Sequence, residues 1–267
     1  MGQAISFPLF VPADRPDRVV KAAASGADAV LADLEDAVAR DRKAEARAAL
    51  LAVVSDLAPA TTLCLRINAE GDPEYVADLD LACRLPLTAL VLPKAESASA
   101  VARLRERTGL PVIALVETAK GLDRVEEIAS ESRQLAFGSI DFAADLGTAH
   151  SPMALLHARS RIVLAARLAG IAAPLDGVTT AVNDAEQLRR DCAHAVEMGF
   201  GGKLLIHPGQ VAPARAAFAP DAATVDWARR VLAAEGAGAV LVGGEMVDAP
   251  VLMRARRVLA RLGPGGA

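Results

Sequence analysis

The 267-residue sequence lacks an excess of basic residues: 29 Lys and Arg stand against 33 Asp and Glu, a formal net charge of −4. An acidic chain with no basic block has no electrostatic footprint for a phosphate backbone, so we expect no nucleic-acid partner. Long apolar runs are also missing. A run such as Val112–Val116 is far shorter than the roughly 20 residues that a membrane span needs, so we expect no membrane segment. The N-terminus also lacks the charged and apolar regions of a signal peptide.

Cysteine and aromatic residues are scarce. The cysteines Cys64, Cys83 and Cys192 are odd in number and lack the spacing of a metal site, which predicts reduced thiols in a cytoplasm and excludes a disulfide scaffold. Aromatic residues make up 3% of the chain, whereas hydrophobic residues make up 53%. That hydrophobic share is too high for a disordered chain. A folded chain of this length buries about three quarters of its unfolded surface, enough for one sizeable core or two small ones.

The order of apolar patterns predicts an α/β fold. Short, β-branched runs alternate with longer amphipathic stretches almost to the C-terminus, which is typical of repeated βα units. The predicted strands are Phe7–Val11, Ala29–Leu34, Thr61–Ile67, Ala89–Leu92, Val112–Val116, Gln134–Phe137, Leu175–Val178 and Lys203–Ile206. The predicted helices between them include Arg18–Ser25, Lys43–Val54, Ser99–Arg107, Leu122–Ala129, Leu155–Ala169 and Ala185–Met198.

Eight such units favour a closed TIM (β/α)₈ barrel over an open doubly wound sheet. The turn after the first strand, residues 12–16, also lacks the G-x-G-x-x-G of a dinucleotide-binding sheet. We expect a catalytic barrel over residues 1–219 and a C-terminal helical extension, or lid, over residues 220–267. In this extension, helical patterns at Thr224–Ala234 and Pro250–Leu262 surround a Gly-rich connection, Gly236–Gly244.

Charged and polar side chains follow the predicted strands, where the βα loops of a barrel build its active face. They are Arg15, then Asp33, Glu35 and Asp36, then Arg66 and Asn68, then Lys94 and Glu96, then Glu117 and Thr118, and finally Asp141. Any one of them alone is readily explained as a surface loop charge. Because the ends of successive strands converge in space, the set as a whole favours a single site.

The chemistry of this set predicts a magnesium site. Glu117 and Asp141 are hard oxygen ligands that, with waters and substrate oxygens, complete the octahedron that Mg²⁺ requires. Zinc is disfavoured because no His or Cys accompanies them. A bound Mg²⁺ chelates a 2-oxo acid and acts as a Lewis acid, while Arg66 and Arg15 offer planar guanidinium groups to a carboxylate or a developing oxyanion. Such a set predicts the making or breaking of a carbon–carbon bond next to a carbonyl.

Nine stretches of the sequence carry a family resemblance. They are LFVPADRP at 9–16 with Lys21–Ala22, DLEDAV at 33–38, LRIN at 65–68, LPKAE at 92–96, VETA at 116–119, GSIDFAADLG at 138–147, HARSR at 157–161, IHPGQ at 206–210 and MVDAP at 246–250. In this order they make the chain similar, over essentially its whole length, to the citrate lyase beta subunit-like proteins of the HpcH/HpaI aldolase/citrate lyase superfamily.

The resemblance implies roles for the residues at the strand ends. Glu117 and Asp141 would hold Mg²⁺, and Arg66 would lie against the substrate's oxygens. Asp33 and Glu35 would orient the arginine and metal-bound water from behind.

Further roles fall on residues at the edge of the pocket and in the tail. Arg15, Thr118 and Gly138 are assigned to substrate binding in the same pocket. Asp248 would be carried on a C-terminal lid that closes over a neighbouring subunit, where it handles the proton at the α-carbon of an acyl-CoA. A homotrimer or a hexamer with shared active sites is therefore expected.

Two departures from the family pattern affect these expectations. Ile140 stands where many relatives have Glu before the metal-binding aspartate, which leaves the substrate subclass open. Ile5 and Ser6 replace the opening Arg-Ser of the family.

The function that we expect is a cytoplasmic, Mg²⁺-dependent carbon–carbon lyase. It would cleave a 3-hydroxyacyl-CoA thioester of the citryl-, malyl- or citramalyl-CoA type to an acyl-CoA and a 2-oxo acid. Two alternatives stay open. One is a pyruvate-type aldolase that splits 4-hydroxy-2-oxo acids, and the other is a non-catalytic structural subunit of a lyase complex whose thioester is tethered to a carrier protein.

Overall fold

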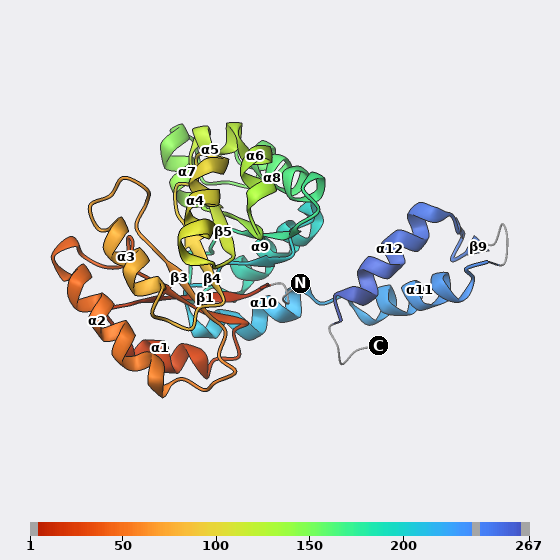
Figure 1. The fold of residues 1–267 in the computed structure, drawn as a ribbon. Helices are drawn as coiled ribbons and strands as arrows, with labels where there is room; N and C mark the ends of the chain where they lie inside the picture. The colour runs from red at the N-terminus through yellow and green to blue at the C-terminus, as the bar shows by residue number, and fades with distance from the viewer. Residues whose placement is uncertain (1–4, 237–240, 263–267) are drawn as a thin grey trace. The chain divides into compact units, whose positions relative to one another are not determined.

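Eight parallel strands form the barrel that the sequence predicts (Figure 1). The computed structural model of the chain describes residues 5–236 and 241–262. The strands follow one another around the sheet in chain order, and a parallel bridge between Leu9 and Leu205 joins the last strand to the first. The Phe10 amide donates to the Leu205 carbonyl at 2.8 Å, and the Leu205 amide donates to the Pro8 carbonyl at 3.0 Å. The sheet is therefore closed, and the prediction of a TIM barrel is confirmed.

The strands lie close to their predicted positions. They are β1 (Pro8–Pro12), β2 (Ala29–Asp33), β3 (Leu63–Arg66), β4 (Ala89–Leu92), β5 (Val112–Val116), β6 (Gln134–Phe137), β7 (Ala172–Asp176) and β8 (Gly202–Lys203). Two of them differ most from the prediction. The ladder of β7 begins three residues early, at Ala172. Strand β8 forms only two residues of regular ladder, and Leu205 beyond it pairs with Leu9 through an isolated bridge.

The helices cover the outside of the barrel, as Figure 1 shows. They are α1 (Pro16–Ala23), α2 (Lys43–Val53), α3 (Tyr75–Ala82), α4 (Ala98–Thr108), α5 (Ala119–Asp123), α6 (Val125–Glu131), α7 (Ser139–Leu146), α8 (Leu156–Leu168), α9 (Ala185–Met198) and α10 (Val211–Phe218). The helix predicted at Leu122–Ala129 is divided at Arg124 into α5 and α6. Helices α3, α7 and α10, each of eight residues, are additional to those named from the sequence.

The alternation of side chains along each strand explains how the barrel positions polar groups. Successive side chains of a strand point to opposite faces, so every second residue enters the barrel. The interior cluster contains Leu31 on β2, Cys64 on β3 and Leu115 on β5. Two residues further along, the same inward series reaches Asp33, Arg66 and Glu117, at the carboxyl ends of these strands. The aliphatic interior and the charged mouth of the barrel thus belong to one continuous pattern.

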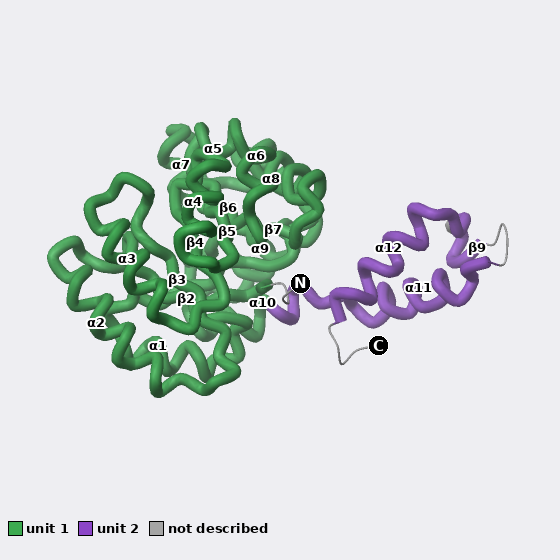
Figure 2. Tube along the Cα trace, viewed as in Figure 1, with its two compact units in different colours: residues 1–214 green, residues 215–267 purple. Residues whose placement is uncertain are grey.

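The chain divides into two compact units, residues 1–214 and 215–267 (Figure 2). This division falls inside α10, a few residues before the expected boundary between 219 and 220, which stays a prediction. In the second unit α11 (Ala222–Ala233) packs on α12 (Ala249–Ala260) through small and β-branched side chains.

A short antiparallel hairpin connects these two helices. It consists of β9 (Leu241–Val242) and β10 (Glu245–Met246). Its turn residues, Gly243 and Gly244, both have positive φ (63° and 86°), which a two-residue hairpin turn of this kind requires. Residues 237–240 of the predicted Gly-rich connection lie outside the described residues. None of the described helices combines the length and the apolar character needed to cross a bilayer.

Candidate active site

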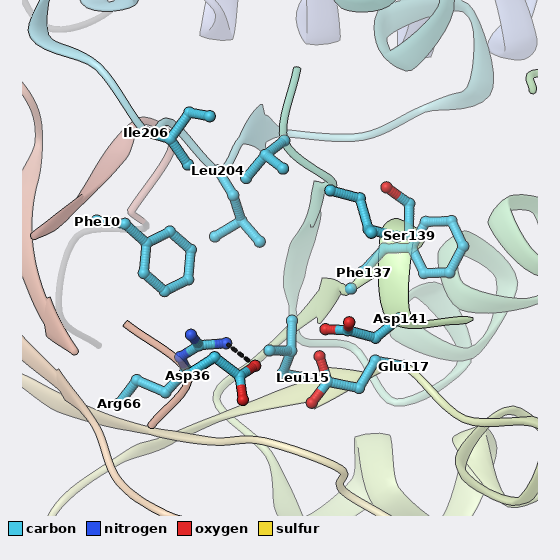
Figure 3. Close-up of a pocket in the computed structure, with 13 residues that line it drawn as sticks. Phe10, Asp36, Arg66, Leu115, Glu117, Phe137, Ser139, Asp141, Leu204 and Ile206 are labelled. Carbon is cyan, nitrogen blue, oxygen red and sulfur yellow. Dashed lines mark ion pairs between the residues drawn. The ribbon is translucent and has the colours of Figure 1, made fainter. Parts of the chain in front are cut away.

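A pocket of about 190 Å³ opens at the carboxyl ends of the barrel strands (Figure 3). Its lining consists of Phe10, Asp36, Arg66, Leu115, Glu117, Phe137, Gly138, Ser139, Ile140, Asp141, Val178, Leu204 and Ile206. Charged side chains come from the ends of β2, β3 and β5 and from α7, whereas β1, β7 and β8 and the residues that follow them supply apolar ones. The structure thus brings Arg66, Glu117, Gly138 and Asp141 together, as predicted.

Glu117 is buried at the end of β5 with only 1% of its surface exposed. Its Oε1 accepts a hydrogen bond from the Lys94 amide at 2.8 Å. Its Oε2 is buried and has no hydrogen-bond partner among the described residues. A Cβ atom on Gly138 would lie 2.4 Å from this Oε2, so the absence of a side chain at Gly138 makes room for the carboxylate.

The surroundings of Glu117 disfavour its charged form. Burial, followed by the negative charges of Glu35 and Asp141, raises the pKa of Glu117 to about 8, although the Lys94 amide and Arg66 act in the opposite direction. A buried carboxylate oxygen without a partner costs free energy unless a cation or donor meets it. The site therefore has a place for a positive charge beside Oε2.

Asp141 supplies a second hard oxygen donor at the same place. It lies in the first turn of α7 with an exposed side chain, and Figure 3 shows its carboxylate close to that of Glu117, on the same side of the pocket. Within residues 5–236 and 241–262, no group of three or more His, Cys, Asp and Glu side chains could hold a metal ion. Mg²⁺ does not need such a group, because it commonly keeps several waters and takes one or two carboxylates together with substrate oxygens. Glu117 and Asp141 therefore fit Mg²⁺.

Arg66 is fixed beside these carboxylates by a two-pronged ion pair. Its Nε and Nη2 donate to the two oxygens of Asp33, both at 2.7 Å, and its Nη1 lies 3.0 Å from Oε2 of Glu35. Although burial acts against the charge, the bonds to Asp33 and the nearby carboxylates raise the pKa of Arg66 above its ordinary value. The guanidinium carbon also lies 4.9 Å from the centre of the Phe10 ring. The guanidinium group of Arg66 is thus permanently charged, and its contacts with Asp33, Glu35 and Phe10 fix its orientation.

Lys94 connects the acidic residues of β2 and β5. Its ammonium group donates to Oε1 of Glu35, while its amide holds Glu117. Lys94 has a φ of 46°, which is uncommon for a residue with a side chain and is frequent at functional sites. Burial is the main cause that raises the pKa of Glu35, ahead of the opposing effects of Arg66 and Lys94. The sequence indicated a charge at position 94 but gave no signal for this backbone contact.

A buried network behind the pocket supports the loop after β2, and its central member, Lys43, is not among the predicted site residues. Lys43, 6% exposed on α2, donates to the carbonyls of Leu34 (2.7 Å) and Glu35 (2.9 Å) and to Oδ1 of Asn68 (2.6 Å). Asn68 donates in turn to Oδ2 of Asp78 at 2.6 Å. A lysine at the start of a helix is usually a solvated charge, so only the fold reveals this role.

Besides Asp33 and Glu35, which contact Arg66 but do not line the pocket, three further predicted site residues lie apart from its lining. Arg15 is exposed at the start of α1, with its Nε 3.9 Å from Oδ1 of Asp14. Thr118 caps α5, because its hydroxyl accepts from the Gly121 amide at 3.0 Å and donates to Glu96 at 3.1 Å. Their roles in substrate binding stay predictions.

Asp248 is the third of these residues and belongs to the second unit. It is exposed and caps α12, where its Oδ1 accepts from the Val251 amide at 3.0 Å. Its assignment as a proton-handling group on a lid stays a prediction.

The chain is similar over most of its length to several known proteins. A model of the HpcH/HpaI aldolase/citrate lyase family matches residues 6–208. The citrate lyase subunit beta-like protein of Mycobacterium tuberculosis (strain H37Rv) is 42% identical over 266 residues, which cover 96% of this chain and 94% of that protein. The (3S)-malyl-CoA thioesterase of Cereibacter sphaeroides (strain ATCC 17029) is 35% identical over 267 residues, with 95% and 93% covered.

Solved structures give the same result. CitE from Mycobacterium tuberculosis in complex with magnesium, acetoacetate and coenzyme A has a TM-score of 0.86 at 40% identity, covering 97% of this chain and 98% of that one. The citrate lyase beta subunit of the same species with oxaloacetate and magnesium has a TM-score of 0.73 at 38% identity, covering 81% and 98%. Magnesium in both structures supports the predicted cofactor. The family is named for aldolases and citrate lyases, which both belong to the carbon–carbon lyases, the enzyme class that the sequence predicted. The chain belongs to the HpcH/HpaI aldolase/citrate lyase family.

Proposed function

We propose that the protein is a Mg²⁺-dependent lyase that cleaves a 3-hydroxyacyl-CoA thioester to an acyl-CoA and a 2-oxo acid. The substrate would be of the citryl-, malyl- or citramalyl-CoA type. One observation carries the proposal: Glu117 is buried, its Oε2 has no hydrogen-bond partner in the described part of the chain, and its carboxylate lies close to Asp141 beside the guanidinium of Arg66. Bound there, Mg²⁺ would act as a Lewis acid toward the oxygens of the 2-oxo acid portion.

Arg66 would stabilise the oxygen that changes from hydroxyl to ketone. Its Nη1 lies 3.9 Å from Oδ2 of Asp36, a residue of the pocket lining, and a donor fixed in advance costs no reorganisation during the reaction. Asp36, whose side chain is 60% exposed, lines the pocket and would accept the hydroxyl proton. The amides in the first turn of an α-helix have no acceptor within the helix. Those of α7 would therefore donate hydrogen bonds to the carboxylate of the 2-oxo acid.

Breaking the carbon–carbon bond leaves an electron pair on the α-carbon of the acyl-CoA, and this carbon must take up a proton. Asp248 would supply it from a neighbouring subunit of a homotrimer or a hexamer, as the family resemblance implies. Its place at the start of α12, shortly after the hairpin turn of Gly243 and Gly244, suits a segment that moves over a site. Asp248→Asn should then abolish CoA-ester cleavage while leaving binding of the 2-oxo acid intact, measured by calorimetry.

The test is a panel of citryl-, malyl- and citramalyl-CoA with the purified protein, with added Mg²⁺ and with EDTA, in which the released 2-oxo acid is measured. We expect turnover of at least one ester with Mg²⁺ and its loss in EDTA. Glu117→Gln and Asp141→Asn should each lose turnover and keep the circular dichroism of the fold. Undiminished activity in either variant would contradict the metal site, and turnover of free CoA esters would contradict a purely structural subunit.

A second candidate reaction is hydrolysis of the thioester, and the similarity to a (3S)-malyl-CoA thioesterase favours it. The same assay separates the two reactions. Cleavage by a lyase yields an acyl-CoA and a 2-oxo acid, whereas hydrolysis yields free CoA and a hydroxy acid. Detection of free thiol with malyl-CoA, without glyoxylate, would favour the thioesterase.

A further inference from the structure

The charges of the pocket are distributed unevenly, and this distribution bears on which 2-oxo acid fits. Among the described residues of the lining, Arg66 is the one with a cationic side chain, whereas Asp36, Glu117 and Asp141 are acidic. Two of the nitrogens of Arg66 already donate to Asp33. Its remaining Nη1 faces Glu35 at 3.0 Å.

The opposite wall of the pocket is apolar. It is formed by the side chains of Phe10, Val178, Leu204 and Ile206, and Figure 3 shows Phe10, Leu204 and Ile206 across the cavity from the carboxylates. Ser139 adds one neutral hydroxyl group, whose oxygen is already 2.9 Å from Nε2 of His150. The described lining therefore has no second cation for a second carboxylate of the substrate.

The three candidate substrates differ in this respect. After cleavage, malyl-CoA gives glyoxylate and citramalyl-CoA gives pyruvate, each with one carboxylate, whereas citryl-CoA gives oxaloacetate with two. The proposed function places the shared 2-oxo acid portion at Glu117, Asp141 and Arg66. The second carboxylate of oxaloacetate would then meet the apolar wall or the like charge of Asp36. A carboxylate buried without a partner is strongly disfavoured.

We infer that the pocket selects a monocarboxylic 2-oxo acid with a small uncharged substituent, of the pyruvate or glyoxylate class, over the dicarboxylic oxaloacetate. This inference rests on the proposed function and narrows its substrate class to citramalyl- or malyl-CoA. The family alone does not decide the matter, because its solved members hold acetoacetate in one case and oxaloacetate in another.

Ile140 is the position at which this selectivity can be changed. It lies in the first turn of α7, lines the pocket and is 40% exposed. A long cationic side chain there could reach the pocket from its rim and pair with a second carboxylate. Ile140 therefore contributes to specificity by leaving the rim uncharged.

The first experiment compares products and substrates on the same protein. We expect kcat/KM for citramalyl- or malyl-CoA to exceed that for citryl-CoA by at least about 100-fold. Burying the unpaired second carboxylate of citryl-CoA costs more free energy than the difference of one methyl group between the other two esters. Equal or faster cleavage of citryl-CoA would overturn the inference while leaving the lyase function intact. Calorimetry with Mg²⁺ should also give a lower Kd for pyruvate than for oxaloacetate, and the reverse order would overturn the inference. If none of the three esters is cleaved, the proposed function fails, and these binding constants still decide the selectivity.

The second experiment uses a pair of variants at one position. Ile140→Arg should raise the ratio of citryl-CoA to citramalyl-CoA cleavage by about tenfold, as expected for one new charge-assisted pair. Ile140→Leu, which keeps the side chain apolar, should leave that ratio unchanged. Because both substrates are measured on the same variant, any effect of the new charge on metal affinity cancels in the ratio. The same ratio in both variants would overturn the role of Ile140.

Discussion

The two halves of the barrel mouth are built from opposite kinds of side chain. We call the ends of β2 to β5 the charged half; it contains Asp33, Glu35, Arg66, Lys94 and Glu117. The apolar half consists of Phe10, Val178, Leu204 and Ile206, supplied by β1 and by the residues after β7 and β8. The charged half carries the groups that polarise the carbonyl of the substrate, whereas the apolar half determines which substituent on that carbonyl fits in the pocket.

The side chains of the charged half are also fixed by many more hydrogen bonds than those of the apolar half. Asp33 alone accepts four hydrogen bonds, two from Arg66 and one each from the amides of Glu35 and Ala37. Buried charges are tolerated only when such partners compensate for the lost hydration. The apolar half is defined by shape alone, which makes it the easier half to alter without loss of the reaction.

Arg66→Lys should cause the largest loss. A lysine keeps the positive charge but has no planar pair of donors for the two oxygens of Asp33. The ammonium group would be positioned only loosely, so we expect kcat to fall by about 10²–10³, the usual effect of losing one fixed donor at a developing oxyanion. Steady-state kinetics on the preferred CoA ester measure this. Arg103→Lys is the matched control, because Arg103 is exposed and pairs with Glu70 at 2.7 Å; its kcat should stay at the wild-type value.

Gly138→Ala should damage the metal site without altering any charge. The φ of Gly138 is −80°, which alanine readily adopts, so the effect comes only from the new Cβ beside Glu117. Displacement of that carboxylate should weaken Mg²⁺ binding by about 10–100-fold, comparable to losses seen when support of a metal ligand is removed. A Mg²⁺ titration by calorimetry measures this. Ser139→Ala is the control, because a methyl group there leaves Glu117 in place, and a similar loss in that variant would contradict the argument.

The raised pKa of Glu117 predicts how stability depends on pH in the metal-free protein. The folded state keeps the proton up to a pKa of about 8, whereas the unfolded chain releases it near the ordinary value of a glutamate. Between these values the folded state binds more protons, so the free energy of unfolding decreases as the pH rises, by at most about 1.4 kcal/mol per pH unit. The contribution is complete below the unfolded pKa and is lost as the pH rises through 8.

Urea unfolding in EDTA from pH 5 to pH 8 measures this slope. Glu117→Gln, which cannot ionise, should flatten the curve relative to the wild type, and Glu127→Gln on the exposed start of α6 should not. Added Mg²⁺ should stabilise the wild type most at high pH, where the carboxylate is free to ionise. A wild-type slope equal to that of Glu117→Gln would show that Glu117 ionises at the ordinary pH of a glutamate. The charged half would then not raise the pKa of this carboxylate.

The sequence predicted the fold and the central residues because both follow from periodicity. Eight apolar runs of strand length are visible directly. Asp33, Arg66 and Glu117 continue the inward alternation of their strands, so the closed barrel brings them together as expected. The hard oxygens of Glu117 and Asp141 predicted a shared Mg²⁺ site at the strand ends, and the resemblance to a lyase family implied the same role for both residues.

What the sequence could not predict depends on contacts made by the backbone or on burial of single side chains. Lys94 acts through its amide, which reaches Glu117 only because φ is 46°. Lys43 looks like a solvated helix residue, and only the packing of α2 buries its ammonium group beneath the loop after β2. Thr118 is the opposite case: its position at a strand end predicted a site residue, whereas its hydroxyl caps α5 in the structure.

Phe10→Leu should produce the smallest effect and tests whether the two halves are independent. Phe10 belongs to the apolar half, yet its ring lies 4.9 Å from the guanidinium carbon of Arg66, within range of a cation–π interaction of about 0.5–2 kcal/mol. Leucine keeps the wall apolar and removes the ring, so kcat should fall by only about 2- to 5-fold, corresponding to the weaker end of that range. Leu204→Met is the control, because it changes the same wall with nearly the same volume and without an aromatic ring. A loss as large as that of Arg66→Lys would mean that the apolar half fixes the orientation of Arg66, so that substrate choice and chemistry could not be altered separately.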